Sequence, residues 1–111
     1  MKQYVPIDRT YCAAVRFRMI RSFADKQTAA IFAGLAVRGL PQDIQKRARI
    51  KLKMLDAAKE PLDLASPPGN RLEELRGDHK GTYSIRVNDQ WRICFAWRDG
   101  EALDVELVDY H

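Results

Sequence analysis

The pattern of apolar and polar residues in the first third of the chain predicts a strand followed by a helix. Ile20–Phe23 is a short apolar run typical of a strand. Asp25 is a suitable cap for a helix that runs to about Val37, with Gly39 beyond its end. The buried face of this helix is expected to carry Ile31, Phe32 and Leu35.

A second helix is predicted from Pro41 to about Ala58. Proline suits the first turn of a helix, and Asp43 is favourable near the positive end of the helix dipole. The apolar stripe of this helix consists of Ile44, Ala48, Leu52 and Leu55. Its solvated side is expected to carry Lys46, Arg49 and Lys53.

The second half of the chain reads as a loop followed by a β-meander. Lys59–Asn70 contains three prolines and a glycine and is expected to be a loop or a pair of turns. Asp99-Gly100 is a strong hairpin signal between the last two strands. The predicted strands are Arg71–Leu75, Tyr83–Asn88, Trp91–Arg98 and Ala102–Tyr110. In the last of these, alternation assigns Leu103, Val105 and Leu107 to the core side. The element order is β-α-α-β-β-β-β, which predicts an α+β domain with two N-terminal helices packed on one face of a mostly antiparallel twisted sheet.

The composition limits the class of protein and the available chemistry. A chain of 111 residues allows one domain with a modest core. The sequence contains no apolar run long enough for a membrane span and no signal peptide at its start, so we expect a cytoplasmic protein without a membrane partner. Cys12 and Cys94, and the histidines His79 and His111, do not have the spacing of a disulfide framework or a metal site. We therefore expect neither a metal nor a cofactor.

The net charge of +4 is unevenly distributed along the chain. Residues 1–18 carry four basic side chains and one acidic one, and the remainder is close to neutral. Global charge is therefore a weak argument for nucleic-acid binding, and the placement of particular arginines matters more. The change at Met19 suggests an extension, 1–18, followed by a domain, 19–111. The alternative is that residues 1–18 add a strand or helix to the domain.

Two arginines are predicted to share the face of the sheet that the helices leave open. Strand alternation places Arg86 and Arg92 on the same face of adjacent strands, where like charges repel unless they share an anion. A phosphate backbone is a suitable anion, because guanidinium groups grip phosphate oxygens in a two-pronged geometry. In the alternative interpretation both arginines are solvated or paired with acidic residues of the last strand: Asp104, Glu106 or Asp109.

The end of the chain and the basic helix face offer further candidates. His111 can transfer a proton near neutral pH, and Tyr110 offers a ring on which a base can stack. Basic side chains are candidates for contacts with RNA, ribosomal RNA included, although they are equally typical of a solvated surface. These basic residues are Lys46, Arg49, Lys53 and Lys80.

Several short motifs resemble those of one toxin family, in the same order. They are Met19-Ile-Arg-Ser-Phe, Leu75-Arg-Gly-Asp, Tyr83-Ser-Ile-Arg-Val-Asn, Gln90-Trp-Arg-Ile-Cys-Phe and the closing Asp109-Tyr-His. The chain is similar over residues 19–111 to the HigB-type toxins of the RelE superfamily, also called plasmid-maintenance killer proteins. Members of that family typically begin at the equivalent of Met19, which suggests an upstream or misassigned start for residues 1–18.

The resemblance implies a fold, an activity and partners. The fold is that of the RelE-like microbial ribonucleases. The activity is metal-independent cleavage of mRNA in the ribosomal A site, and the partners are the ribosome, its mRNA and a HigA-type helix-turn-helix antitoxin. The family's catalytic positions fall on Arg76, Arg86, Arg92, Tyr110 and His111. Some relatives have lysine at the position of Arg76. Arginine holds its proton more firmly, so Arg76 suits phosphate stabilisation better than acid catalysis.

Two other functions use parts of the same sequence. A non-catalytic RNA- or ribosome-binding module would use the arginine face without His111, and an antitoxin-binding subunit of a repressor complex would need neither. Direct DNA binding by this chain alone is not expected, because the apolar stripes of both predicted helices are needed to cover the sheet.

Overall fold

The computed structural model describes residues 5–6, 19–75 and 81–109, and it confirms the α+β architecture. The helices are α1 (Lys26–Phe32) and α2 (Gln42–Ala57), followed by two 3-10 helices, η2 (Pro61–Ala65) and η3 (Pro68–Asn70). The strands are β1 (Val5–Pro6), β2 (Ser22–Phe23), β3 (Glu73–Glu74), β4 (Thr82–Arg86), β5 (Trp91–Arg98) and β6 (Glu101–Asp109). Within the described part of the chain, no helix has the length and apolar character that a bilayer crossing requires.

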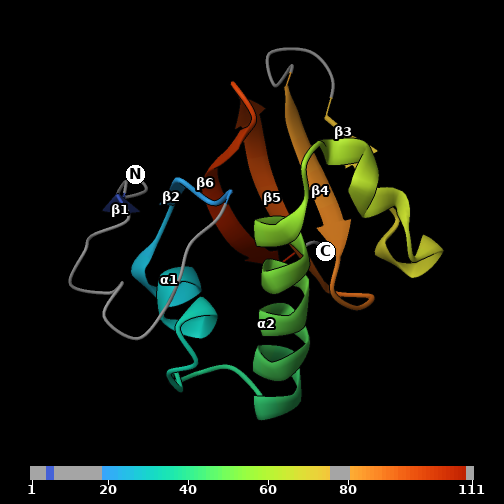
Figure 1. Ribbon diagram of the computed structural model, residues 1–111. Coiled ribbons are helices and arrows are strands. Elements are labelled where there is room, and N and C mark those ends of the chain that lie inside the picture. The colour runs from blue at the N-terminus through green and yellow to red at the C-terminus, as the bar shows by residue number, and fades with distance from the viewer. Residues whose placement is uncertain (1–4, 7–18, 76–80, 110–111) are drawn as a thin grey trace.

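The strands form one sheet in the order β1-β2-β6-β5-β4-β3, and the two helices lie on one face of it (Figure 1). The pairing is antiparallel except between β2 and β6, where Phe23 lies opposite Val105 in parallel register. The expected mostly antiparallel sheet is therefore confirmed. Of the first 18 residues the structure describes only β1, which pairs with β2, so the division of the chain at Met19 stays a prediction.

Helix α1 is shorter than the sequence pattern predicts. Its start is confirmed, because the Asp25 side chain accepts a hydrogen bond of 2.7 Å from the backbone N–H of Thr28. The predicted end near Val37 is wrong, since the helix stops at Phe32 and Gly34 takes a left-handed conformation with φ +86°. Gly34 rather than Gly39 is the glycine that terminates it. Leu35, predicted to be buried, consequently lies beyond the helix and is 56% exposed.

The hairpin between β5 and β6 confirms one expectation and corrects another. Asp99 and Gly100 both have positive φ, as a two-residue turn of this kind requires. Further along, β6 contains an extra residue at a bulge, with Asp104 at φ +53°. The bulge shifts the alternation, so Ala102 rather than Leu103 points into the core with Val105 and Leu107.

The core lies between the helices and the sheet, and a buried carboxylate fixes its edge. Asp56, near the end of α2, is 5% exposed and accepts hydrogen bonds from the backbone N–H groups of Met19 and Ile20, at 2.9 and 3.0 Å. These bonds tie the segment that precedes β2 to α2. They satisfy backbone groups that would otherwise lose their hydrogen bonds on burial.

Replacing Asp56 with alanine is expected to lower the free energy of unfolding by about 2–4 kcal/mol, because two backbone donors lose a charged acceptor. Asp56→Asn keeps an acceptor oxygen and should lose less. Urea denaturation of both variants measures the effect. Asp43→Ala, on the exposed first turn of the same helix, is the control. An Asp56→Ala protein as stable as the control would show that this contact does not hold the segment.

Candidate functional site

Strands β4 and β5 bring Arg86 and Arg92 together. The two residues are direct partners in the antiparallel register, so their side chains leave the same face of the sheet. This confirms the pairing inferred from strand alternation. Because directly opposed like charges repel each other, the arrangement needs other groups to stabilise it.

Arg92 is buried, with 8% of its surface exposed, and hydrogen bonds to other described residues fix its guanidinium group. Its Nε donates to Ser84 Oγ at 2.8 Å, and its Nη2 donates to the backbone carbonyls of Arg71 and Ser84 at 2.6 and 3.2 Å. The alternative in which Arg92 is solvated is therefore wrong. A guanidinium held in one orientation is suited to stabilising charge without reorganisation.

Arg86 lies closer to solvent and pairs with a residue that sequence reasoning did not consider. Its Nη2 forms a salt bridge with Asp89 Oδ1, in the turn between β4 and β5. The same turn is held by Asn88, whose side-chain oxygen accepts hydrogen bonds from the N–H groups of Gln90 and Trp91 at 2.9 and 2.7 Å. The expected alternative partners lie on β6, whereas the ion pair is local to the hairpin. Such an exposed pair stabilises a protein only weakly and can be exchanged for another anion.

These side chains surround a cavity of about 230 Å³, here called the arginine pocket. It is lined by Arg71, Glu73, Arg86, Asn88, Asp89 and Arg92. Arg71 follows η3 in a left-handed conformation (φ +45°), and its backbone carbonyl accepts the hydrogen bond from Arg92.

The arginine pocket favours negative charge. The hydrogen bond from Arg86 holds the pKa of Asp89 below its usual range, and the charges of Arg86 and Arg71 act in the same direction. Two arginines at separate positions in the sequence thus stabilise one carboxylate at the pocket. A phosphate group offers the same charge with more acceptor oxygens.

The end of β6 lies beside the start of β5. Asp109 is opposite Trp91 in the sheet, and its carboxylate accepts a hydrogen bond of 3.2 Å from the Gln90 side chain. The expected catalytic residues Arg76, Tyr110 and His111, and the expected RNA contact Lys80, lie outside the described residues. Their roles stay predictions.

The three basic residues of α2 that were predicted to contact RNA lie on the side of the helix that faces α1. Lys46 and Arg49 line a separate groove against α1, and Lys53 lies over the Phe32 ring with its Nζ 4.5 Å from the centroid. The structure therefore does not bring these three to the arginine pocket. Their assignment to RNA stays a prediction.

Lys51 of the same helix lies near Arg86 instead. Its Nζ donates a hydrogen bond to Asn70 Oδ1, next to Arg71. Burial lowers the pKa of Lys51, and the charges of Arg86 and Arg47 lower it further. Lys51 lies beside Leu52 at the edge of the apolar stripe, so the helical period contained a signal for this position. The sequence contained no comparable signal for Arg71, whose place depends on the loop.

Comparisons with known proteins show which family the chain resembles. Residues 21–111 match the HigB-like toxin family, described as RelE-like toxin of type II toxin-antitoxin system HigB. The chain is 50% identical over 68 residues to Toxin HigB-1 of Vibrio cholerae, which covers 61% of this chain and 72% of that protein. It is 33% identical over 93 residues to Endoribonuclease HigB of Proteus vulgaris, which covers 84% of this chain and all of that protein.

A solved structure shows the same fold. The YoeB-YefM complex from Staphylococcus aureus contains a chain that superposes with a TM-score of 0.53 at 18% identity. The match covers 87% of this chain and 99% of that one. At this identity the likeness supports the fold alone.

Proposed function

This chain belongs to the HigB-like family of RelE-like toxins of type II toxin-antitoxin systems, and we propose that it is an endoribonuclease that cuts mRNA in the ribosomal A site. The observation that carries the proposal is the direct pairing of Arg86 with Arg92 in a pocket that favours an anion. A relative named as an endoribonuclease, aligned over its whole length, supports the same activity. Cutting mRNA during translation would make the chain an inhibitor of protein synthesis in the cytoplasm.

The reaction that suits this pocket needs no metal. The ribose 2′-hydroxyl attacks the adjacent phosphorus as its proton passes to a base, and the bond to the 5′ oxygen breaks as that oxygen takes up a proton. The products are a 2′,3′-cyclic phosphate and a 5′-hydroxyl. Negative charge accumulates on the phosphoryl oxygens during this step, and Arg86 and Arg92 supply positive charge beside them.

The proton-transfer groups are proposed from the family's motif. His111 would protonate the leaving 5′ oxygen, Tyr110 would stack on an unpaired base, and Arg76 would add a third charge for the phosphate. Asp109 would orient His111 or accept the proton of the 2′-hydroxyl. A site with so weak a base would depend on the ribosome to align the mRNA, which explains a ribosome requirement.

The proposed partners follow from the toxin-antitoxin assignment. The structural neighbour was solved in a complex with YefM. For this chain we propose a protein antitoxin that restrains the nuclease, of the HigA helix-turn-helix type, and the translating ribosome with its mRNA as the target.

Cleavage of a defined mRNA in a reconstituted translation system tests the proposal. The 5′ ends of the products are mapped with and without ribosomes. We expect cuts inside codons that occupy the A site, and intact mRNA when ribosomes are omitted. Intact mRNA under both conditions would overturn the proposal and favour a binding module or a subunit of a repressor complex.

Arg71 is expected to contribute to mRNA binding. Its backbone carbonyl holds Arg92, so a substitution that keeps the left-handed conformation removes only the side chain. Asparagine tolerates that conformation. Arg71→Asn should raise the KM for ribosome-bound mRNA about tenfold, because one phosphate contact is lost.

The matched control for Arg71→Asn is Arg98→Asn, which removes an exposed arginine at the far end of β5. The two variants should have the same melting temperature. Equal KM values in steady-state cleavage would show that the Arg71 side chain does not contact the substrate.

A further inference from the structure

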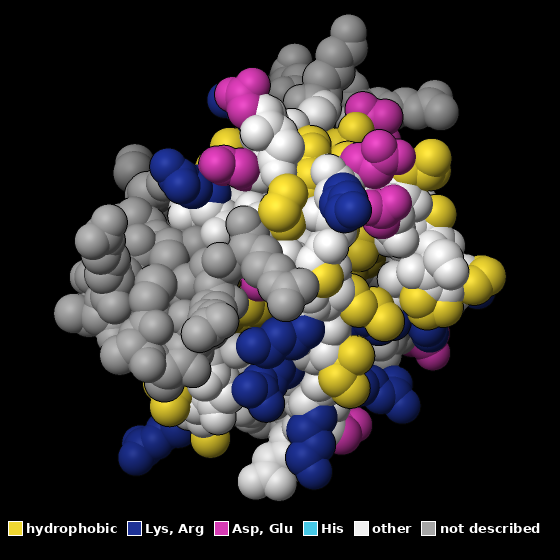
Figure 2. Space-filling model, viewed as in Figure 1, with side chains coloured by type: hydrophobic (Ala, Val, Ile, Leu, Met, Phe, Trp, Pro, Cys, Tyr) yellow, Lys and Arg dark blue, Asp and Glu magenta, His cyan; other side chains and the backbone are white. Residues whose placement is uncertain are grey.

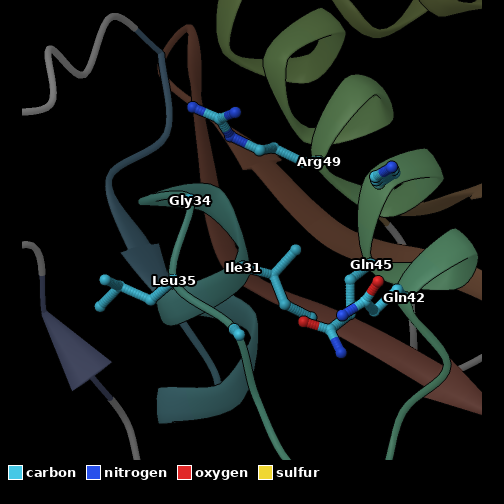
Figure 3. A pocket seen from close by; sticks show the side chains of 8 residues that line it. Ile31, Gly34, Leu35, Gln42, Gln45 and Arg49 are labelled. Atoms are coloured by element: carbon cyan, nitrogen blue, oxygen red, sulfur yellow. The ribbon is translucent and has the colours of Figure 1, made fainter.

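A second cavity lies apart from the arginine pocket. It occupies about 300 Å³ between α1 and α2 and is here called the α1–α2 groove (Figure 3). It is lined by Ile31, Gly34, Leu35, Ala36, Gln42, Gln45, Lys46 and Arg49. None of these described residues lines the arginine pocket.

One wall of the groove is apolar and firmly held. Leu35 lies in the loop after α1 with 56% of its surface exposed, beside the buried Ile31. The loop is fixed by Gln45, whose side chain accepts a hydrogen bond from the N–H of Val37 at 3.0 Å and donates to the carbonyls of Val37 and Leu40 at 3.0 and 2.8 Å. The groove is therefore preformed, and a partner that binds there need not order the loop first.

The opposite wall carries positive charge. Lys46 and Arg49 are exposed on α2, and a Cβ added to Gly34 would lie 3.3 Å from the guanidinium carbon of Arg49. Gly34 thus lets Arg49 extend along the mouth of the groove, and a side chain at this position would displace it. Figure 2 shows lysine and arginine side chains gathered beside apolar ones on the face that carries α2.

We propose that the α1–α2 groove binds an acidic, amphipathic segment of the antitoxin, a partner that rests on the function proposed above. Apolar side chains of that segment would cover Leu35 and Ile31, and its carboxylates would pair with Lys46 and Arg49. A preformed apolar groove with a charged rim is how folded domains take up short amphipathic segments. Burial of Leu35 supplies affinity, and the two cations supply orientation.

Two other occupants fit the groove less well. Residues 1–18 of this chain carry net positive charge, so Lys46 and Arg49 would repel them. RNA would satisfy the two cations but not the apolar wall, because none of the described lining residues is aromatic and able to stack on a base.

Leu35→Asp tests the docking site. The probe is the purified antitoxin encoded by the gene beside that of this chain, with affinity measured by isothermal titration calorimetry. We expect at least about thirtyfold weaker binding for Leu35→Asp and about tenfold for the milder Leu35→Ala, from loss of apolar contact. The control Ile50→Asp changes a side chain on α2 that is also 56% exposed but lies outside the groove lining. Binding by Leu35→Asp and Leu35→Ala equal to that of the control would overturn the inference.

Reversing the charges of Lys46 and Arg49 distinguishes a protein partner of the α1–α2 groove from an RNA partner. Lys46→Glu combined with Arg49→Glu should weaken antitoxin binding about thirtyfold at low salt and much less at high salt. The control Lys59→Glu reverses an exposed charge beyond the end of α2. Unchanged antitoxin affinity together with slower cleavage of ribosome-bound mRNA would assign the groove to RNA and overturn the inference.

The inference and the proposed nuclease function can fail separately. Leu35→Asp should cut ribosome-bound mRNA at the wild-type rate, since Leu35 lies outside the arginine pocket. If wild-type protein left mRNA intact while its antitoxin affinity still depended on Leu35, the nuclease function would be wrong and the docking site would stand.

Discussion

Replacing Arg92 with lysine is expected to slow cleavage of ribosome-bound mRNA at saturation by about 100-fold, the usual cost of losing one preorganised donor to a transition-state charge. Lysine keeps the charge but not the planar fork that reaches Ser84 and the carbonyl of Arg71 together. The effect should therefore fall on kcat more than on KM. The measurement is single-turnover cleavage of an mRNA programmed on the ribosome.

Measurements of the free energy of unfolding distinguish the role of the Arg92 charge in cleavage from the role of Arg92 in packing. Arg92→Ala leaves buried acceptors without their donor and should lower the free energy of unfolding by about 2–3 kcal/mol in addition to its effect on cleavage. Ser84→Ala removes one partner but not the charge, and should slow cleavage less than tenfold. Arg98→Lys, at the exposed end of the same strand, is the matched control. Wild-type cleavage by a folded Arg92→Lys protein would remove Arg92 from the mechanism.

Replacing His111 with alanine is expected to slow cleavage by about 100- to 1000-fold, the usual contribution of a positioned general acid. Asp109, two residues earlier, pairs with Trp91 beside Arg92, and two residues of chain extend at most about 7 Å. We therefore expect His111 to act at the arginine pocket. The dependence of the rate on pH should lose the fall at high pH that deprotonation of an imidazolium acid produces.

The control for His111 is His79→Ala, which removes the other histidine of the chain. It should cut at the wild-type rate, because His79 is not one of the proposed catalytic residues. Equal rates and equal pH profiles for the two variants would show that another group protonates the leaving oxygen. The charge stabilisation by Arg86 and Arg92 would then account for catalysis without His111.

Local sequence patterns were sufficient to predict those structural features that depend on residues close together in the chain. The Asp99-Gly100 turn and the cap at Asp25 are decided by backbone chemistry over a few residues. The pairing of Arg86 with Arg92 follows from alternation along two strands joined by a short turn. The core of the candidate site was therefore predictable from the sequence.

The remaining features depend on contacts that periodicity does not encode. The end of α1 was misplaced because two glycines follow the helix, and only the fold selects Gly34. The bulge at Asp104 changes the inward set of β6 without any glycine to mark it. Arg71 enters the arginine pocket because Arg92 binds its carbonyl across 21 residues of chain, a contact that belongs to the tertiary structure.

The contacts of Arg86 and Arg92 also make the arginine pocket suitable for binding a phosphate. Arg92 donates hydrogen bonds to a hydroxyl and two carbonyls, which hold its guanidinium group in one orientation. Arg86 holds an exposed carboxylate that a phosphate can displace at little cost. One arginine is thus rigid and the other adjustable, which suits a substrate delivered by the ribosome.

The most direct test of the account is single-turnover cleavage of a short mRNA held with one codon in the ribosomal A site, prepared with ribose throughout and with 2′-deoxyribose at the nucleotide before the cut. The account predicts that the all-ribose mRNA is cut once within that codon to give a new 5′-hydroxyl, and that the 2′-deoxy mRNA stays intact. An all-ribose mRNA that stays intact, or equal cutting of both, would contradict it.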